Sequence, residues 1–500
     1  MINIKGARLV FTYVLLFCFF GFEANAQNHF YFSPVCIEAQ NHIATLRLKK
    51  AEQLLAAEKK LHPTNSAIDF LENYIDYYRL VTGQDYSNFN AIEAQMDARL
   101  KLVKKLPAST PYLLYTQSEI NLQLGFVKSF NSEYVGAMLA FRSAYQLAKS
   151  NVEKFPDFKP SQKTVGMFKT LLGTIPSNYK WMLSVAGLSG DFDGGMAQIH
   201  QYFKTDNYPA FVLDKQNTEF YYTLFMLNFD DKQKAWDFCN QHTKDYQTNL
   251  LSCYLRAFTA SKSAQNDEAI LVLQNRPKTA DYEPFYGLDY LHGQFKLNRL
   301  DDDAEHSLKR FVSFNKGKLY MKDAYRRISW SYLIKNDIEK FKVYRELSKR
   351  YGSANSEEDQ NIERELAMGS QQDVVILKAR LLFDGGYYQR AEDMIKQREP
   401  EQLKSDYHKL EYYYRYARIL QEQKKYNKAV EYYDYVIKNS PTNTPYYFAP
   451  NACLQLGYIY QNLGFKQLAK SNFNKVSIYT KAEFIEGIKV KSAKELATLK

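Results

Sequence analysis

The sequence predicts an all-α fold, an α-solenoid of stacked helix–turn–helix units, and three observations support this prediction. Amphipathic runs with helical periodicity, about 12–20 residues long, fill the chain between prolines and glycines. Period-2 strand patterns joined by Asn-Gly or Asp-Gly hairpin turns are absent, and the Asp-Gly at 193–194 lies between expected helices. The carboxyl-terminal half is also self-similar, with related segments 38 and 40 residues apart.

The amino-terminal end has the pattern of a secretory signal peptide over residues 1–26. Lys5 and Arg8 precede an uncharged apolar run at 9–22, and Ala24 and Ala26 place small residues at −3 and −1 of a cleavage point. The run is shorter than the roughly 20 apolar residues that span a bilayer. We therefore expect an exported chain, cleaved after Ala26, that acts in the periplasm or at the cell envelope.

The charge balance is moderately basic, with 66 Lys and Arg against 55 Asp and Glu and a formal net charge of +11. Residues 466–500 hold a local excess, with eight Lys against three Glu. A solvated helix surface accounts for such a bias, and contact with an anionic membrane surface is the alternative. Nucleic acid is not expected as a partner of an exported chain.

Four cysteines follow the expected cleavage point, namely Cys36, Cys239, Cys253 and Cys453. No two of them have CxxC spacing, so the sequence indicates neither a zinc site nor thioredoxin-like redox chemistry. Cys239 and Cys253 lie on neighbouring expected helices. Whether they pair stays open, because an oxidising compartment permits disulfides while buried free cysteine is common in helical cores.

Residues 27–284 predict an irregular series of helical hairpins. The expected helices are 39–60, 66–82, 90–105, 112–128, 132–154, 164–173, 177–187, 193–204, 217–228, 232–243 and 249–262. Within this region, "DFDGG" (191–195) is interpreted as a turn that caps the next helix, because a calcium loop needs a carboxylate at its twelfth position. The surrounding segment 168–199 resembles a stretch of the Iml2/TTC39 group of repeat proteins, which implies a helical scaffold without transferable catalytic residues.

Residues 285–500 predict repeats, continuous with the preceding solenoid. The tyrosine-rich stretch "YYRYARILQEQKKYNKAVEYYDYVIKNSP" (413–441) aligns with "CLQLGYIYQNLGFKQLAKSNFNKVSIYTK" (453–481). Segments 375–395 and 288–311 fit the same pattern, and 325–352 is a more divergent unit. A small residue recurs at the expected helix crossing, as Ala304, Ala391, Ala429 and Ala469.

This pattern resembles the tetratricopeptide repeat family, in which each unit is a helix–turn–helix of about 34 residues. The resemblance implies that most tyrosines pack between helices and that other first-helix positions form a concave binding surface. Carried onto this sequence, those positions are Ile376, Arg380, Phe383, Tyr414, Arg418, Gln421, Leu454, Tyr458 and Gln461. Arg380 and Arg418 occupy the same slot in successive repeats, where paired guanidinium groups are suited to bind a carboxylate or a phosphate.

The sequence holds no HExxH, HxH or Gly-x-Ser-x-Gly pattern, so we expect no catalytic residue, metal site or cofactor. "DDDAEH" (301–306) is interpreted as an acidic helix start, which the helix dipole favours. The predicted function is an exported, non-enzymatic scaffold that binds a protein or peptide. The alternative is an outer-membrane glycan-capture protein resembling the SusD group, which also combines repeat helices with aromatic platforms; a missing lipobox and only three Trp weigh against it.

Overall fold

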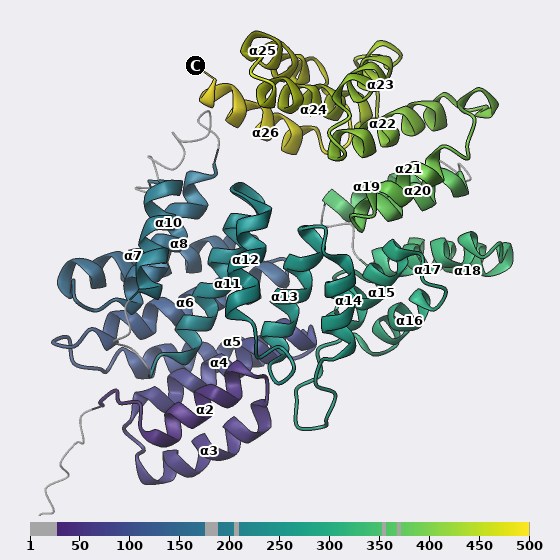
Figure 1. The fold of residues 1–500 in the computed structure, drawn as a ribbon. Coiled ribbons are helices and arrows are strands. Elements are labelled where there is room, and N and C mark those ends of the chain that lie inside the picture. The colour runs from purple at the N-terminus through teal and green to yellow at the C-terminus, as the bar shows by residue number, and fades with distance from the viewer. Residues whose placement is uncertain (1–27, 176–188, 205–209, 353–356, 368–371, 500) are drawn as a thin grey trace, which may run out of the picture.

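The computed structural model describes residues 28–175, 189–204, 210–352, 357–367 and 372–499 and builds them from α-helices in antiparallel pairs (Figure 1). Within these ranges the only extended pairing is an isolated bridge between His29 and Asn65. The predicted all-α solenoid is therefore confirmed. The expected signal peptide and the expected helix 177–187 lie outside the described residues.

The amino-terminal half contains α2 (Pro34–Ala44), α3 (Leu48–Leu61), α4 (Ser66–Gly83), α5 (Phe89–Val103), α6 (Tyr112–Phe130), α7 (Tyr134–Lys154), α8 (Pro160–Gly173), α10 (Phe192–Phe203), α11 (Val212–Phe229), α12 (Lys232–His242), α13 (Leu250–Lys262) and α14 (Asn266–Gln274). The carboxyl-terminal half contains α15 (Gly287–Arg299), α16 (Ala304–Phe314), α17 (Met321–Ile334), α18 (Ile338–Arg350), α19 (Glu357–Ala367), α20 (Val374–Asp384), α21 (Tyr388–Ile395), α22 (Asp406–Glu422), α23 (Tyr426–Lys438), α24 (Phe448–Asn462), α25 (Lys466–Lys475) and α26 (Ile485–Thr498), with short 3₁₀ turns at Pro400–Gln402 and Val476–Ile478. None of the helices in the described ranges has the length and apolar content that a membrane span requires.

The expected single helix 39–60 is wrong, because the structure divides this stretch into α2 and α3. Leu46 causes the break: its backbone adopts the left-handed conformation, with φ of 63°, while its side chain is fully buried. A left-handed residue ends a helix, and leucine rarely adopts this conformation. Burial of the Leu46 side chain therefore offsets a backbone preference, and the local sequence holds no glycine or proline that signals the turn.

The helices from α2 onward curve until α11 packs against α2. Two hydrogen bonds fasten this closure. The side-chain amide of Gln40 donates to the carbonyl of Ala210 at 2.8 Å, and the amide of Gln216 donates to the carbonyl of Ala44 at 3.2 Å. Further along, Asp191 caps α10 by accepting a hydrogen bond from the Gly194 amide at 3.0 Å, which confirms the helix-capping interpretation of this loop.

Every segment that the sequence aligned as a repeat forms a helical hairpin, in the pairs α15–α16, α17–α18, α20–α21, α22–α23 and α24–α25. The four crossing alanines are fully buried, so their small size sets how closely paired helices approach. Gly457 plays the same part in α24, because a Cβ atom there would lie 2.3 Å from Cε1 of Phe473. Of three tyrosines predicted to pack in the tyrosine-rich stretch, Tyr416 and Tyr433 are buried and Tyr413 is half-buried.

Two large hydrophobic cores run along the solenoid, and two smaller clusters lie among α6, α7, α8, α10, α11 and α12. The larger extends from Phe32 to Leu381, and the second from Ile376 to Ile488, so that α20 contributes to both. At the end of the chain α26 covers α24 and α25. The four cysteines of the described residues are buried and unbonded, Cys239 and Cys253 among them.

Candidate functional site

The predicted binding residues lie on the first helices of the last three repeats. Arg380 and Phe383 come from α20. The other predicted residues are Tyr414, Arg418 and Gln421 on α22, and Tyr458 and Gln461 on α24. These helices, with α26, lie on the side of the repeats that looks toward the amino-terminal half, whereas α23 and α25 lie on the outer side (Figure 1). The first helices therefore form the side of these repeats that faces the amino-terminal half (Figure 1).

Arg380 and Arg418 each lie over an aromatic ring on this surface. The guanidinium carbon of Arg380 is 5.1 Å from the ring centroid of Trp330, and that of Arg418 is 5.1 Å from the ring centroid of Phe383. Cation–π contact at this distance orients a planar guanidinium without using its N–H donors. Both side chains keep about a quarter of their surface accessible, at 25% and 23%.

Arg415 joins these two residues and was missed by the sequence analysis. It lies between two rings of the second core, 5.6 Å from the centroid of Tyr414 and 5.9 Å from that of Tyr447. A signal was available, because residues three apart on a helix share a face and Arg415 precedes Arg418 by three positions. We call Arg380, Arg415 and Arg418 the arginine face.

Among the described residues, Arg415 is the member of the arginine face that hydrogen-bonds a carboxylate, because its guanidinium donates to Glu411 at 3.4 Å. The nearest carboxylate oxygens are 4.0 Å from Arg380, 3.4 Å from Arg415 and 3.9 Å from Arg418. By comparison, Arg299 lies 2.6 Å from a carboxylate of Asp301. The buried Nε atoms of Arg415 and Arg418 also lack a hydrogen-bond partner in the described part of the chain. Several strong donors are thus available to an anionic ligand.

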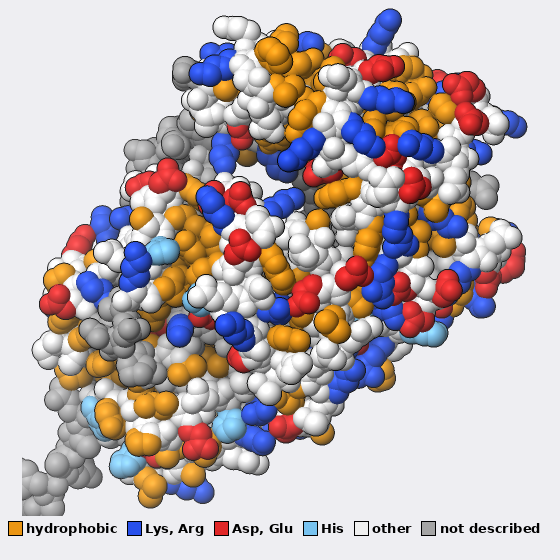
Figure 2. Space-filling view, in the orientation of Figure 1, with side chains coloured by type: hydrophobic (Ala, Val, Ile, Leu, Met, Phe, Trp, Pro, Cys, Tyr) orange, Lys and Arg blue, Asp and Glu red, His pale blue; other side chains and the backbone are white. Residues whose placement is uncertain are grey.

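The electrostatic surroundings of Arg418 are also positive. Lys491 on α26 has a lowered pKa because of its burial and because of the charges of Arg418 and Lys232. Lys232 belongs to α12 of the amino-terminal half, so cations from both halves face a common space. Figure 2 shows an opening beneath the carboxyl-terminal helices with basic side chains around it. A bound anion would relieve this repulsion.

Three of the predicted residues hold the repeats together. The ring of Tyr414 is 1% exposed, and its hydroxyl accepts a hydrogen bond from the Asn451 amide at 2.7 Å. Gln421 donates to the side-chain carbonyl of Gln455 at 3.0 Å. Gln461 donates to Glu495 of α26 at 3.1 Å. These contacts join α22, α24 and α26, so they fix the spacing of the surface on which the arginines lie.

Four further positions complete the predicted set. Two of them, Ile376 and Leu454, are wrong as surface positions, because they are 1% and 2% exposed and belong to the second core. Tyr458 is half-buried and makes an edge contact with Phe473, with 5.6 Å between ring centroids. Phe383 supplies the ring beneath Arg418. Tyr458 and Phe383 support the floor of the surface, and the arginines are the groups on it with unused donor capacity.

Comparison with known families gives one match, to the tetratricopeptide repeat, at residues 410–443 and 450–477. No curated protein matches the chain. Among solved structures, the apo quorum sensor NprR from B. thuringiensis aligns over 81% of this chain and 97% of its own, with 12% identity and a TM-score of 0.33. Yeast Tom70 aligns over 87% and 88%, with 13% identity and a TM-score of 0.33. The human IFIT1 dimer with PPP-AAAA aligns over 95% and 97%, with 12% identity and a TM-score of 0.29.

Structural similarities of this size do not assign a function, and the family match carries the identification. It covers the α22–α23 and α24–α25 hairpins, which are the units that the sequence aligned most completely. Repeats of this family support a role as a protein-interaction scaffold. Residues 410–443 and 450–477 are therefore tetratricopeptide repeats, at the carboxyl-terminal end of an all-α solenoid.

Proposed function

We propose that this chain is an exported, non-enzymatic repeat scaffold of the cell envelope, and that its arginine face binds an acidic segment of a protein partner. The observation that carries the proposal is that Arg380 and Arg418 are held against aromatic rings with no carboxylate oxygen closer than 3.9 Å, beside a third arginine, Arg415, that is paired with Glu411. Guanidinium groups bind carboxylates through two parallel hydrogen bonds, and three such groups on neighbouring helices match several acidic side chains along one segment.

Export follows from the pattern of residues 1–26, so the mature protein is expected to begin at Gln27. Expression in a secreting bacterial host, followed by cell fractionation and amino-terminal sequencing of the product, checks this. Recovery of the protein in the cytoplasm with Met1 retained would contradict the expectation.

The substitution Arg418→Glu is expected to weaken binding of an acidic peptide by at least about tenfold, which corresponds to about 1.4 kcal/mol. It removes a donor and places a like charge in the ligand's path. The measurement is fluorescence anisotropy with a labelled peptide of about ten residues that alternates glutamate and glycine. The melting temperature should change by only about two degrees, because Arg418 contributes no close ion pair.

The matched control is Arg350→Glu, which makes the same charge change at an exposed position on α18. If the two substitutions weaken peptide binding equally, the change in net charge alone explains the loss of affinity, and a site at Arg418 is contradicted. Arg418→Lys should give an intermediate affinity, since lysine keeps the charge but lacks the planar fork.

The same proposal includes peripheral contact with an anionic membrane through the lysine-rich end of the chain. The turn between α24 and α25 and the start of α25 expose three large apolar side chains, Leu463 at 45%, Phe465 at 54% and Leu468 at 47%. Lys466 lies among them and is also exposed. Apolar side chains flanked by lysines favour the surface of an anionic bilayer, where each lysine contributes about 1 kcal/mol.

Phe465→Asp is accordingly expected to reduce cosedimentation with vesicles of phosphatidylglycerol and phosphatidylcholine by several-fold. Binding of the unchanged chain should fall as salt is raised from about 0.05 to 0.5 M, because screening shortens the reach of the lysines. Leu61→Asp, at an apolar residue 72% exposed on α3, is the control. If vesicle binding changes neither with salt nor with Phe465→Asp, the proposed membrane contact is contradicted.

A further inference from the structure

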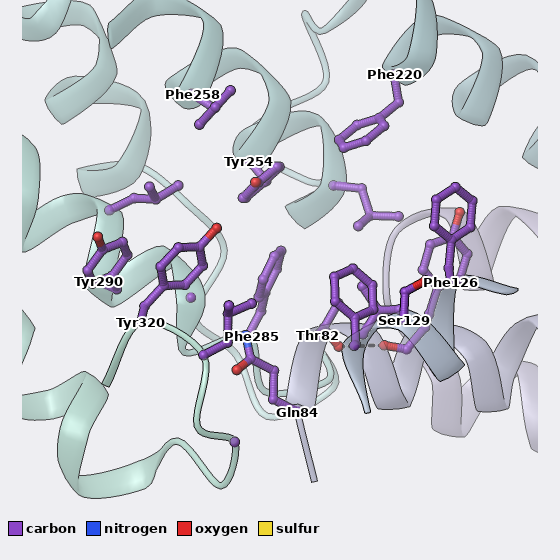
Figure 3. A pocket seen from close by; sticks show the side chains of 18 of the residues that line it. Thr82, Gln84, Phe126, Ser129, Phe220, Tyr254, Phe258, Phe285, Tyr290 and Tyr320 are labelled. Carbon is purple, nitrogen blue, oxygen red and sulfur yellow. Dashed lines mark hydrogen bonds between the residues drawn. The ribbon is translucent and has the colours of Figure 1, made fainter. Parts of the chain in front are cut away.

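A large cavity lies away from the arginine face, in the amino-terminal half and its junction with α15. Its volume is about 1140 Å³, slightly above the range of about 300–1,000 Å³ common for small-molecule pockets. Its walls come from α4, α6, α11, α13 and α15, and from the loop that precedes α17 (Figure 3). None of the three arginines of that face lines it. The two sites are therefore open to separate tests.

Stacked aromatic rings form one wall of the cavity. The ring of Tyr254 is nearly parallel to three others, with centroids 6.2 Å from Phe220, 5.9 Å from Phe258 and 5.6 Å from Phe285. Figure 3 shows these rings turned toward the cavity from separate segments of the chain. Such a wall provides a wide apolar surface whose rings hold one another in place.

A second pair of rings, Tyr290 and Tyr320, stacks at 4.7 Å beside this wall. Tyr320 comes from the loop before α17, so the cavity combines residues more than two hundred positions apart in the sequence. In Figure 3, Tyr290 and Tyr320 lie together on one side of Phe285, and Phe220 lies on the other. The apolar surface is thus continuous along the cavity.

The polar groups between the rings are mostly uncharged. Thr82, Ser129 and Asn217 line the cavity, as does Gln84. Gln84 is only 8% exposed, and its side-chain oxygen has no hydrogen-bond partner in the described part of the chain. A buried acceptor without a partner is costly, so this oxygen favours an occupant that carries an N–H or O–H donor.

The charged side chains that line the cavity are nearly balanced, with four cations and three anions, namely Lys262, Lys316, Lys318, Arg327, Asp85, Glu219 and Asp359. Arg327 forms an ion pair with Asp323, and Glu219 lies 3.1 Å from the ring nitrogen of His242. Asp85 accepts a hydrogen bond from the Ser87 hydroxyl at 2.6 Å. Because the charges of the lining nearly cancel, the cavity matches an occupant without net charge.

An exposed apolar patch on α7 continues from the rim of the cavity. Tyr134 lines the cavity and is 60% exposed. Beyond it, Val135 is 71% exposed, Met138 63% and Leu139 56%. Contiguous exposed apolar side chains on a soluble protein mark interaction sites. Aliphatic side chains and a methionine on an open helix surface suit the side chains of another polypeptide, whereas a sugar gains little from them.

We propose that the aromatic cavity and the α7 patch together form a second binding site, which takes an uncharged, apolar segment of a partner polypeptide. An aromatic or leucine side chain of this segment enters the cavity, a backbone N–H meets the Gln84 oxygen, and the rest of the segment lies across α7. The inference rests on the proposed function in that it assumes a polypeptide partner, and it assigns that partner a second point of attachment.

The test uses the full mature chain and a labelled neutral peptide of about twelve residues that alternates phenylalanine or leucine with serine or asparagine. Fluorescence anisotropy should show saturable binding. Gln294→Trp, which fills the cavity from α15, and the pair Val135→Asp with Met138→Asp should each weaken it by about tenfold or more. Val343→Asp, at a residue 56% exposed on α18, is the matched control and should change nothing.

The acidic peptide separates this inference from the proposed function. The affinity for the acidic peptide should be unchanged by the cavity and α7 substitutions. The affinity for the neutral peptide should be unchanged by Arg418→Glu. If the neutral peptide does not bind at about 1 mM, the second site is overturned, whereas the proposed binding of acidic segments at the arginine face is not affected. Binding of a neutral glucose hexasaccharide that is lost in Gln294→Trp but unaffected on α7 would overturn the polypeptide assignment in favour of a glycan. If Gln294→Trp fails to fold, the α7 pair decides the test, since both side chains are exposed.

Discussion

Lys163→Met is expected to lower the free energy of unfolding of the amino-terminal half by about 3–5 kcal/mol. The ammonium group of Lys163 on α8 lies 2.8 Å from Glu119 of α6 and 2.7 Å from Asp214 of α11. All three side chains are only 2% exposed. Removing the cation leaves two carboxylates buried without a counter-charge, in the space where three helices meet.

The loss should depend on pH in an unusual direction. With Lys163 present, burial already raises the pKa of Asp214 to about 6, with Lys163 opposing the rise and Glu119 adding to it. Between an unfolded pKa near 4 and this value the folded chain binds more protons than the unfolded chain. The contribution of Asp214 to the free energy of unfolding therefore falls as pH rises through that window. Loss of Lys163 extends the window to higher pH, because the cation no longer opposes the rise in the pKa of Asp214.

Urea unfolding at pH 5, 6.5 and 8 measures this effect. Lys163→Met should be most destabilising at pH 8 and least at pH 5, where the fold can take up a proton on a buried carboxyl group. Lys149→Met, at a lysine with 61% of its side chain exposed, serves as the control and should cost little at any pH. A loss from Lys163→Met that is constant across the three pH values would show that the carboxylates do not share the charge of Lys163.

The carboxyl-terminal hairpins could be predicted because each repeats a pattern that the sequence shows several times. A crossing alanine, such as Ala429, fixes the register of a whole hairpin. The alignment of one hairpin can then be tested against the equivalent alanine in the neighbouring repeats. The amino-terminal half offers no such comparison. Its first helix was predicted as one piece because the break at Leu46 depends on burial of that side chain, which is a tertiary effect.

The candidate sites also differ in whether the sequence could predict them. Arg380 and Arg418 could be found because the repeat pattern places them in equivalent slots. The aromatic cavity could not be found, because its lining joins residues as distant as Tyr77 and Tyr320 and no local motif records their meeting. The same holds for Lys163, whose two carboxylate partners are 44 and 51 positions away along the chain.

Ala429→Trp is expected to destabilise the carboxyl-terminal repeats by about 3 kcal/mol or more. Ala429 is fully buried at the crossing of α23 with α22, next to Tyr433, which is also fully buried. An indole has no room there, because the neighbouring rings already fill the space beside the alanine methyl group. The helices of the hairpin must separate, and the contact with α24 separates with them.

The damage should stay within the second core, because a solenoid unit contacts mainly its neighbours and the two cores meet only around α20. Hydrogen exchange should show lost protection from α20 to α26 while α2 to α16 keep theirs, and thermal unfolding should split into two steps. Ala137→Trp is the comparison, since Ala137 is 3% exposed on α7 and its overpacking should affect the opposite end. Uniform loss of protection after Ala429→Trp would mean that the solenoid unfolds as one cooperative unit, and that the peptide sites of its two halves are energetically coupled.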